Sequence, residues 1–221
     1  MATLAFTRYG AGVPLVLLHA IGSSRHAWDP VIPALAERFD VLAVDLPGFG
    51  DSEPMSPQIE PVPAVLAAPV AGLLDASRWL ARHAARPLSR LVSYRLGRAL
   101  VLGQTHGQPF HITADQARTA IQAMGTCPGF GATLKAMAAR RYHPGRPIDA
   151  PVTVAFGSRD RLLLRHQSRH LDGLPPDTQL RTLPGCGHVP MADAPLAVAA
   201  LITASAGAGP PGERPAGEPG L

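Results

Sequence analysis

Two short, uninterrupted apolar runs near the N-terminus constrain the fold more than any other feature of this sequence. They are "VPLVLLHA" (13–20) and "DVLAVDLP" (40–47), and runs of this kind are typical of parallel strands that are buried on both faces. The segment between them, "WDPVIPALAERF" (28–39), has helical spacing, with Asp29 expected as its N-cap and Pro30 at the first helical position. Strand, helix and strand in this order predict a right-handed βαβ unit.

The same kind of pattern returns near the C-terminus. "APVTVAFGSRDRLL" (150–163) and "TQLRTLPGCGHVPM" (178–191) each predict a strand followed by a polar loop, and "APLAVAALITASA" (194–206) predicts a closing helix. "TLAFTRYG" (3–10) alternates as an edge strand would. The middle of the chain predicts helices only, over 61–76 with a break near Pro69, 78–103, 113–126 with Thr113 as N-cap, and 128–142.

We therefore expect an α/β fold with a mostly parallel sheet and a helical insert. The expected parts are an N-terminal part of the core (1–76), a helical cap-like insert (77–147), a C-terminal part of the core (148–206) and a tail (207–221). The tail consists mostly of Gly, Pro, Ala and Glu, a composition that predicts disorder.

Composition excludes several classes of protein. Cys127 and Cys186 lie far apart and form no metal-binding pair, which favours a reducing compartment. The N-terminus shows no signal-peptide pattern, and no apolar run reaches the roughly 18 residues that a membrane span needs. The net charge of +4 comes almost wholly from arginine, and six arginines between residues 78 and 98 are spaced as the solvated face of a helix. We expect a cytoplasmic protein without nucleic-acid or membrane partners.

Four stretches carry a resemblance to a known family. They are "PLVLLHAIGSS" (14–24), "VLAVDLPGFGDS" (41–52), "APVTVAFGSRDRLL" (150–163) and "TLPGCGHVPMADAP" (182–195). In order and spacing they resemble the α/β-hydrolase superfamily, in its small esterase-, lipase- and lactonase-like branch with a helical cap. The resemblance covers residues 3–60 and 148–203 closely, and the middle of the chain only as a cap-like segment. It implies hydrolysis of a small ester-like molecule without a metal or cofactor.

The resemblance also implies roles for particular residues. His188 stands where the family keeps the histidine that takes a proton from the nucleophile and returns it to the leaving group. Asp160 stands where the family has the acid that orients this imidazole. The segment His19, Ala20, Ile21 and Gly22 resembles the loop whose backbone N–H, near position 21, stabilises an oxyanion. Ala20 departs from the family pattern, which more often has glycine there.

The nucleophile of the family is missing. It occupies a G-x-S-x-G turn between a strand and a helix, and none of the ten serines has glycine on both sides at that spacing. Two central strands and the helix between them would be expected near Ala76 and Ser77, which implies an internal loss of roughly 50 residues, about the size of a βαβ unit. Either the strand at 14–20 pairs with the one at 151–157, or two apolar edges stay open. We therefore predict a sheet without its central strands and a marginally stable protein.

Three readings of function stay open. The first is an ester-hydrolase relative without a competent nucleophile. The second is an active hydrolase that uses Thr105, in the G-x-T-x-G of "GQTHG" (103–107), or a water activated by His188. The third is a non-catalytic protein that binds small molecules or acts as a scaffold. The sequence does not decide the substrate or the oligomeric state.

Overall fold

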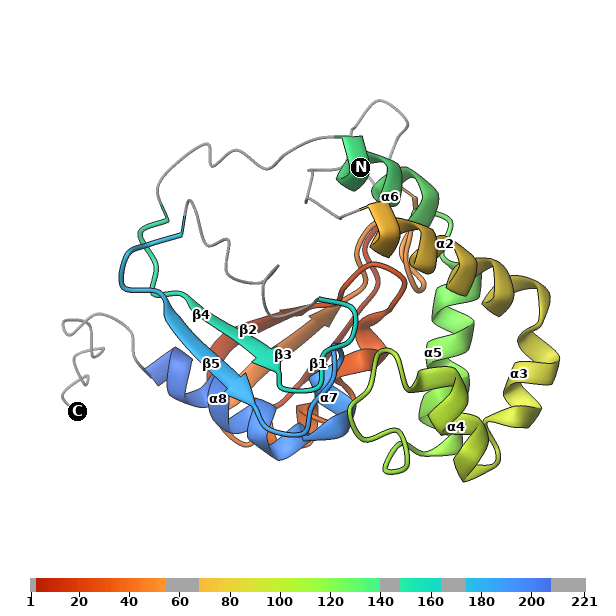
Figure 1. The fold of residues 1–221 in the computed structure, drawn as a ribbon. Helices are drawn as coiled ribbons and strands as arrows, with labels where there is room; N and C mark the ends of the chain where they lie inside the picture. The colour runs from red at the N-terminus through yellow and green to blue at the C-terminus, as the bar shows by residue number, and fades with distance from the viewer. Residues whose placement is uncertain (1–2, 55–67, 140–147, 164–173, 208–221) are drawn as a thin grey trace, which may run out of the picture.

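The computed structural model describes residues 3–54, 68–139, 148–163 and 174–207. The strands are β1 (Phe6–Tyr9), β2 (Val13–Leu18), β3 (Phe39–Val44), β4 (Thr153–Gly157) and β5 (Gln179–Leu183). A 3₁₀ helix, η1 (Arg25–Trp28), precedes α1 (Ile32–Leu35), α2 (Ala68–His83), α3 (Ala85–Leu91), α4 (Arg95–Leu102), α5 (Ala114–Thr126), α6 (Phe130–Ala139), α7 (Pro190–Asp193) and α8 (Pro195–Gly207). Figure 1 shows α2 to α6 gathered on one side of the molecule, with the strands and α8 on the other.

The βαβ unit predicted near the N-terminus is confirmed. β2 runs parallel to β3, with Val13 opposite Phe39, and β1 adds to the far side of β3 in the antiparallel direction. The helix between the strands differs from the prediction, because α1 begins at Ile32 with Val31 as its N-cap, rather than at Pro30. Pro33 lies in the first turn of α1, where a missing N–H costs nothing, so the helix begins later than Pro30 indicated.

The strands form two separate sheets. One has the order β1-β3-β2, and the other is the parallel pair β4-β5. In the described part of the chain, β2 and β4 each have a strand partner on one side only. The predicted reduction of the sheet is therefore confirmed, and of the two arrangements considered the protein adopts the one with two groups of strands.

One hydrophobic core nevertheless joins the two halves. Leu17 and Val41 of the first sheet belong to the same buried cluster as Cys186, Val198 and Ala199 from the C-terminal part of the chain. Helices α1 and α8 also pack against each other. Apolar burial is non-directional, so the two halves stay together through this core and through helix packing, although no strand joins the two sheets in the described ranges.

Helix α2 continues without a break through the position where the sequence predicted an internal loss of residues. It runs from Ala68 to His83 and so includes Ala76 and Ser77, while residues 61–67 of the predicted helix lie outside the described residues. The long helix predicted over 78–103 is wrong in its continuity: it consists of the end of α2, then α3 and α4. The chain turns at Tyr94, whose extended backbone makes it the N-cap of α4.

Helix α5 is the centre of the helical insert. It begins at the predicted N-cap, Thr113, whose hydroxyl accepts a hydrogen bond from the N–H of Gln116 in a complete capping box. Its buried residues Ala117 and Ile121 share a cluster with Ala81 of α2 and Val92 and Leu102 beside α3 and α4. The inner faces of these helices therefore surround α5, and their outer faces turn to solvent.

Candidate functional site

His188 and Asp160 lie together at the ends of the two C-terminal strands. The Nδ1 atom of His188 is 3.0 Å from Oδ2 of Asp160. Asp160 follows β4, and His188 follows β5, and the two strands are parallel and in register. Polar loops at the carboxyl ends of parallel strands meet at one edge of the sheet, so the contact follows from the topology. The side chain of His188 is 29% exposed and that of Asp160 only 7%.

The Asp160 carboxylate is held from both sides. Its other oxygen, Oδ1, accepts the backbone N–H groups of Leu162 at 2.8 Å and Leu163 at 2.9 Å. Burial by itself raises the pKa of this carboxyl, but the hydrogen bond to His188 and the two backbone donors outweigh burial, and the net pKa is lowered. Asp160 therefore stays ionised near neutral pH and can fix a proton on Nδ1 of His188. That tautomer leaves Nε2 free to accept a proton.

A loop of the helical insert is fastened against this pair by a buried carboxylate. Asp193, 6% exposed at the end of α7, accepts three backbone N–H groups. Its Oδ2 binds the N–H of Gly107 at 2.8 Å and that of Gly187 at 2.7 Å, and its Oδ1 binds the N–H of Gln108 at 2.8 Å. Gly187 directly precedes His188, so the position of the His188 loop depends on this carboxylate.

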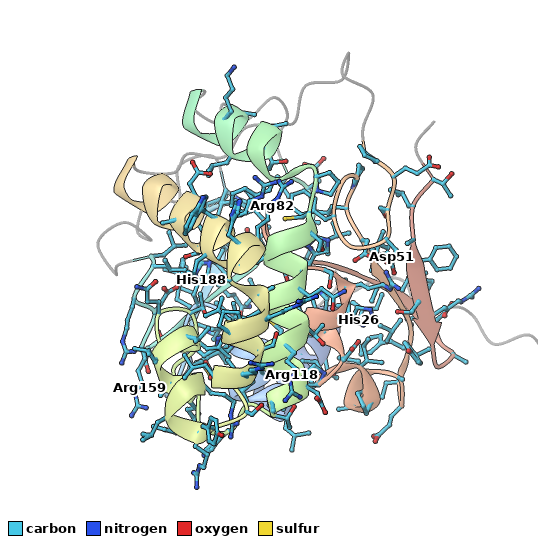
Figure 2. All side chains as sticks on the ribbon, turned by 90° about the vertical axis from the view of Figure 1, so that its right-hand side faces the viewer. His26, Asp51, Arg82, Arg118, Arg159 and His188 are labelled. Carbon is cyan, nitrogen blue, oxygen red and sulfur yellow. The ribbon has the colours of Figure 1, made fainter. Side chains whose placement is uncertain are left out.

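Glycines allow the three loops to approach closely. A Cβ atom on Gly107 would lie 2.1 Å from the carbonyl oxygen of Gly185, and one on Gly157 would lie 2.1 Å from that of Gly187. Arg159 adds two hydrogen bonds. Its backbone N–H donates to the carbonyl of Cys186 at 2.8 Å, and its guanidinium donates to the carbonyl of Gly107 at 3.2 Å. In Figure 2, Arg159 and His188 lie on the same flank of the molecule, opposite His26 and Asp51.

The loop at 19–22 begins with a buried, neutral histidine. His19 donates from Nδ1 to the carbonyl of Ala20 at 2.8 Å and accepts the N–H of Leu46 at Nε2, at 3.0 Å. Burial lowers the pKa of His19 more than its hydrogen bond to Ala20 and the charge of Asp45 raise it. A neutral imidazole is required for Nε2 to accept, so His19 joins this loop to the one after β3 and has a structural role.

The remainder of the loop keeps a free donor and lies under the insert. To the described residues, the backbone N–H of Ile21 makes no hydrogen bond. Gly22 has a left-handed backbone with φ of 73°, and a Cβ atom there would lie 2.6 Å from Cε of Met124 in α5 and 3.2 Å from Phe130 in α6. The helical insert thus contacts both this loop and the His188 loop. No hydrogen bond within the described ranges joins residues 19–22 to Asp160 or His188.

The backbone of Thr105 contacts the His188 loop, whereas its hydroxyl contacts other residues. The carbonyl of Thr105 accepts the N–H of Val189 at 2.9 Å. Its Oγ1 donates to the carbonyl of Leu102 at 3.1 Å and lies 2.8 Å from Nδ1 of His106. Thr105 follows helix α4 in a turn, so it does not stand on a strand-to-helix elbow. By its backbone geometry, the G-x-T-x-G sequence at 103–107 is therefore a turn of the helical insert and not a strand-to-helix elbow.

Two cavities lie elsewhere. One, of about 420 Å³, follows α2 beside Arg78, Trp79 and Arg82, and the other, of about 450 Å³, lies between the β4-β5 pair and α8. Neither is lined by Asp160, His188 or residues 19–22. Across the described ranges, no three His, Cys, Asp or Glu side chains gather as metal ligands. The helices in those ranges are all too short or too polar to cross a bilayer.

Comparison with known proteins agrees with this geometry. A family model described as "alpha/beta hydrolase fold" matches residues 13–83. A thermophilic esterase from Thermogutta terrifontis superposes with a TM-score of 0.62 at 20% identity, covering 92% of each chain. The enol-lactonase from Burkholderia xenovorans LB400 superposes with a TM-score of 0.62 at 19% identity, covering 93% of this chain and 97% of the other. The chain has the α/β-hydrolase fold.

Curated relatives of this α/β-hydrolase-fold protein match it mostly over short segments. A pimeloyl-[acyl-carrier protein] methyl ester esterase from Aeromonas hydrophila is 43% identical over 72 residues, which are 33% of this chain. A soluble epoxide hydrolase from Corynebacterium sp. (strain C12) is 61% identical over 44 residues. The matches span only 28% and 15% of those relatives. The methyl ester esterase from Chromobacterium violaceum is 28% identical over 82% of this chain and 89% of its own length.

The hydrolase fold thus brings together part of the expected site. It joins Asp160 to His188 and turns the hydroxyl of Thr105 toward His106, and among the described residues the N–H of Ile21 has no acceptor. Sequence reasoning missed Asp193. The available signal was a carboxylate five residues after His188 in an otherwise apolar segment, because buried carboxylates are rare unless they are paired or hydrogen-bonded.

Proposed function

We propose that this chain retains the acid/base pair of a carboxylic-ester hydrolase but forms no acyl-enzyme. It would bind an ester-like small molecule without efficient turnover. The observation that carries the proposal is the 3.0 Å contact between His188 and Asp160, formed in a chain whose sequence has no G-x-S-x-G. Relatives named as methyl ester esterases and a fold shared with an esterase and a lactonase support the substrate class.

The chemistry follows from which protons these residues can move. Asp160 holds a proton on Nδ1 of His188, so Nε2 is the basic atom that faces a substrate. In an ester hydrolase, Nε2 takes a proton from a serine hydroxyl, which then attacks the acyl carbon. To the described residues, Nε2 of His188 makes no hydrogen bond. Without a G-x-S-x-G serine this base has no elbow hydroxyl to activate, so the pair forms no acyl-enzyme.

The proposal is tested with a short-chain p-nitrophenyl ester and a fluorophosphonate probe, which labels activated hydroxyl nucleophiles covalently. We expect the native chain and the His188→Ala variant to hydrolyse the ester at the same rate, without an initial burst. We also expect no fluorophosphonate adduct by mass spectrometry. Turnover that disappears in His188→Ala, or a covalent adduct, would overturn the proposal.

One observation favours a second candidate, in which Thr105 acts as an unorthodox nucleophile. Its hydroxyl lies 2.8 Å from Nδ1 of His106. Burial lowers the pKa of His106 and keeps it neutral, against the opposite effect of Asp193. This imidazole would accept the hydroxyl proton if that proton rotated from the carbonyl of Leu102 toward Nδ1. In this case the adduct would map to Thr105 and would be absent from Thr105→Val, whereas Ser158→Ala, a loop serine control, would keep it.

A further inference from the structure

Charge is distributed very unevenly along this chain. Residues 77–147 hold eleven of the twenty lysines and arginines but only one of the sixteen acidic residues, Asp115. This segment therefore has a formal charge of +10, and the rest of the chain has −6. Between Asp75 and Asp115 the sequence contains six arginines and no carboxylate. A charge asymmetry of this size between two parts of one chain indicates an anionic partner for the basic part.

The most exposed apolar side chains of the molecule lie in the same segment. Four large apolar side chains in the described residues are more than 70% exposed, and three of them are Tyr94 (72%), Leu96 (78%) and Leu100 (77%). Leu96 and Leu100 are one turn apart on α4, so they share a face. Monomeric proteins usually expose apolar residues singly. A cluster of exposed apolar side chains on two consecutive helices therefore indicates a surface that contacts an apolar partner.

Arginines surround these side chains. We use the term α3–α4 face for the exposed residues Arg86, Arg90, Leu91, Tyr94, Arg95, Leu96 and Leu100. In the part of the chain that the structure describes, none of its three arginines forms an ion pair. Arg95 lies with its guanidinium 5.8 Å from the centre of the Phe110 ring, which adds another half-exposed apolar group at the border of the face.

The face points away from the fold. Val92 and Leu102, from the same helix-turn-helix, turn inward to the cluster around α5, and Arg98 also turns inward, donating to the carbonyls of Val92 and Ser93. In Figure 1, α3 and α4 form the outer border of the molecule on the side opposite α8. The Asp160–His188 pair is not part of this face.

We propose that the α3–α4 face binds an anionic lipid surface, with helix α4 lying along the membrane rather than across it. Leu96, Leu100 and Tyr94 would enter the boundary between headgroups and acyl chains, and the arginines would donate to lipid phosphates. This combination of exposed leucine and aromatic side chains with arginine is typical of interfacial helices. The proposal revises the expectation, drawn from the absence of an apolar run, that the protein has no membrane partner.

Shape and charge favour a lipid surface over a protein partner. Protein interfaces centre on residues that fill a pocket, but the two cavities described above are lined by no residue of the α3–α4 face. Tyr94, Leu96 and Leu100 are more than 70% exposed, and a fluid lipid surface needs no matching pocket. A second copy of this chain is disfavoured, because two identical arginine-rich faces would repel each other.

The test is flotation of the full chain with vesicles of phosphatidylcholine and phosphatidylglycerol, compared with phosphatidylcholine alone. We expect binding to the anionic vesicles only, weakened by high salt. The variant Leu96→Ser/Leu100→Ser and the variant Arg86→Gln/Arg90→Gln/Arg95→Gln should each bind about tenfold more weakly or worse. The matched control is Leu196→Ser in α8, which removes an equally exposed leucine (74%) from another face and should bind as the native chain does.

Three results would overturn the proposal. The first is no binding to anionic vesicles, and the second is equal loss of binding in the Leu196→Ser control. The third is binding to an acidic protein that the arginine variant abolishes while vesicle binding is unchanged, which would assign the face to a protein partner. All substituted side chains are exposed, so circular dichroism of the variants should match the native chain and excludes unfolding as the cause.

Discussion

The backbone N–H of Gly107 donates to Oδ2 of Asp193 across 2.8 Å, between residues 86 positions apart in the chain. This bond and its two companions from Gln108 and Gly187 fasten the helical insert to the loop that carries His188. They matter because no strand connects the N-terminal and C-terminal sheets in the described residues. The geometry of the candidate site therefore depends on the hydrogen bonds to the Asp193 carboxylate and on helix packing, rather than on one continuous sheet.

Loss of the Asp193 carboxylate should destabilise the protein strongly. Asp193→Ala would leave three N–H groups without an acceptor, and an unsatisfied buried polar group costs about 1–3 kcal/mol. We expect a fall in the free energy of unfolding of about 3 kcal/mol or more, measured by urea denaturation. Asp177→Ala, at an exposed position, should change it by less than about 0.5 kcal/mol. Equal effects in the two variants would show that the three hydrogen bonds to Asp193 do not stabilise the fold.

A methyl group at Gly107 should separate the packed loops. Its Cβ would lie 2.1 Å from the backbone oxygen of Gly185, so Gly107→Ala should cost about 1–3 kcal/mol of unfolding free energy. The matched control is Gly131→Ala in α6, where no atom lies within 4 Å of the added Cβ. That change should leave stability unchanged or raise it by up to about 1 kcal/mol. A tolerated Gly107→Ala would contradict the close packing.

Stability should fall as the pH drops below about 6.5. Burial lowers the pKa values of His19 and His106 in the folded state, so the unfolded chain binds protons first as the pH falls, and unfolding becomes more favourable. The lowered pKa of Asp160 acts at lower pH, because its stabilisation is lost only as the pH falls through its folded value.

The measurement is the free energy of unfolding between pH 7.5 and pH 5. We expect it to decrease, with a smaller decrease in His19→Gln, because glutamine does not titrate. His111→Gln, at an exposed position, should keep the native slope. A flat profile in the native chain would show that burial does not shift these two histidines.

The open edge of the first sheet should promote association. Val16 and Leu18 of β2 are 56% and 55% exposed, and β2 has a strand partner on one side only in the described part of the chain. Exposed apolar edge strands pair with other chains. We expect concentration-dependent light scattering that Val16→Lys/Leu18→Lys reduces and Leu196→Lys does not. A monomeric native chain with a cooperative melt would contradict both this prediction and that of marginal stability.

The sequence predicted secondary structure correctly where neighbouring residues decide it. Apolar runs predicted the parallel pairing of β2 with β3, and Thr113 three residues before Gln116 predicted the start of α5. Helix boundaries that depend on neighbours were wrong. The helix predicted to begin at Pro30 begins at Ile32, and the one predicted over 78–103 is divided at Ala84 and again before Arg95. Periodicity records which face of a helix is apolar and not where the chain turns.

The candidate site was readable in part for the same reason. Two polar loops after parallel strands predict that Asp160 and His188 lie close, and the structure joins them at 3.0 Å. Asp193 was not foreseen, since a carboxylate that accepts N–H groups from both the insert and its own loop has no periodic signature. The domain boundary expected at residues 76 and 77 falls inside the continuous helix α2, and the tail from residue 208 onward lies outside the described residues.

The sequence by itself determined the strands, the order of the loops and the absence of a G-x-S-x-G turn, because each follows from residue types at short spacing. The acid/base roles of Asp160 and His188 were implied by the family resemblance and stay a prediction. Only the tertiary structure decided how the protein holds together when no strand joins its two sheets in the residues that the structure describes. It places Leu17 and Val198 in one core and binds Gly107 to Asp193. Such contacts join residues far apart in the chain, and they form because apolar surface must be buried and buried polar groups must be paired.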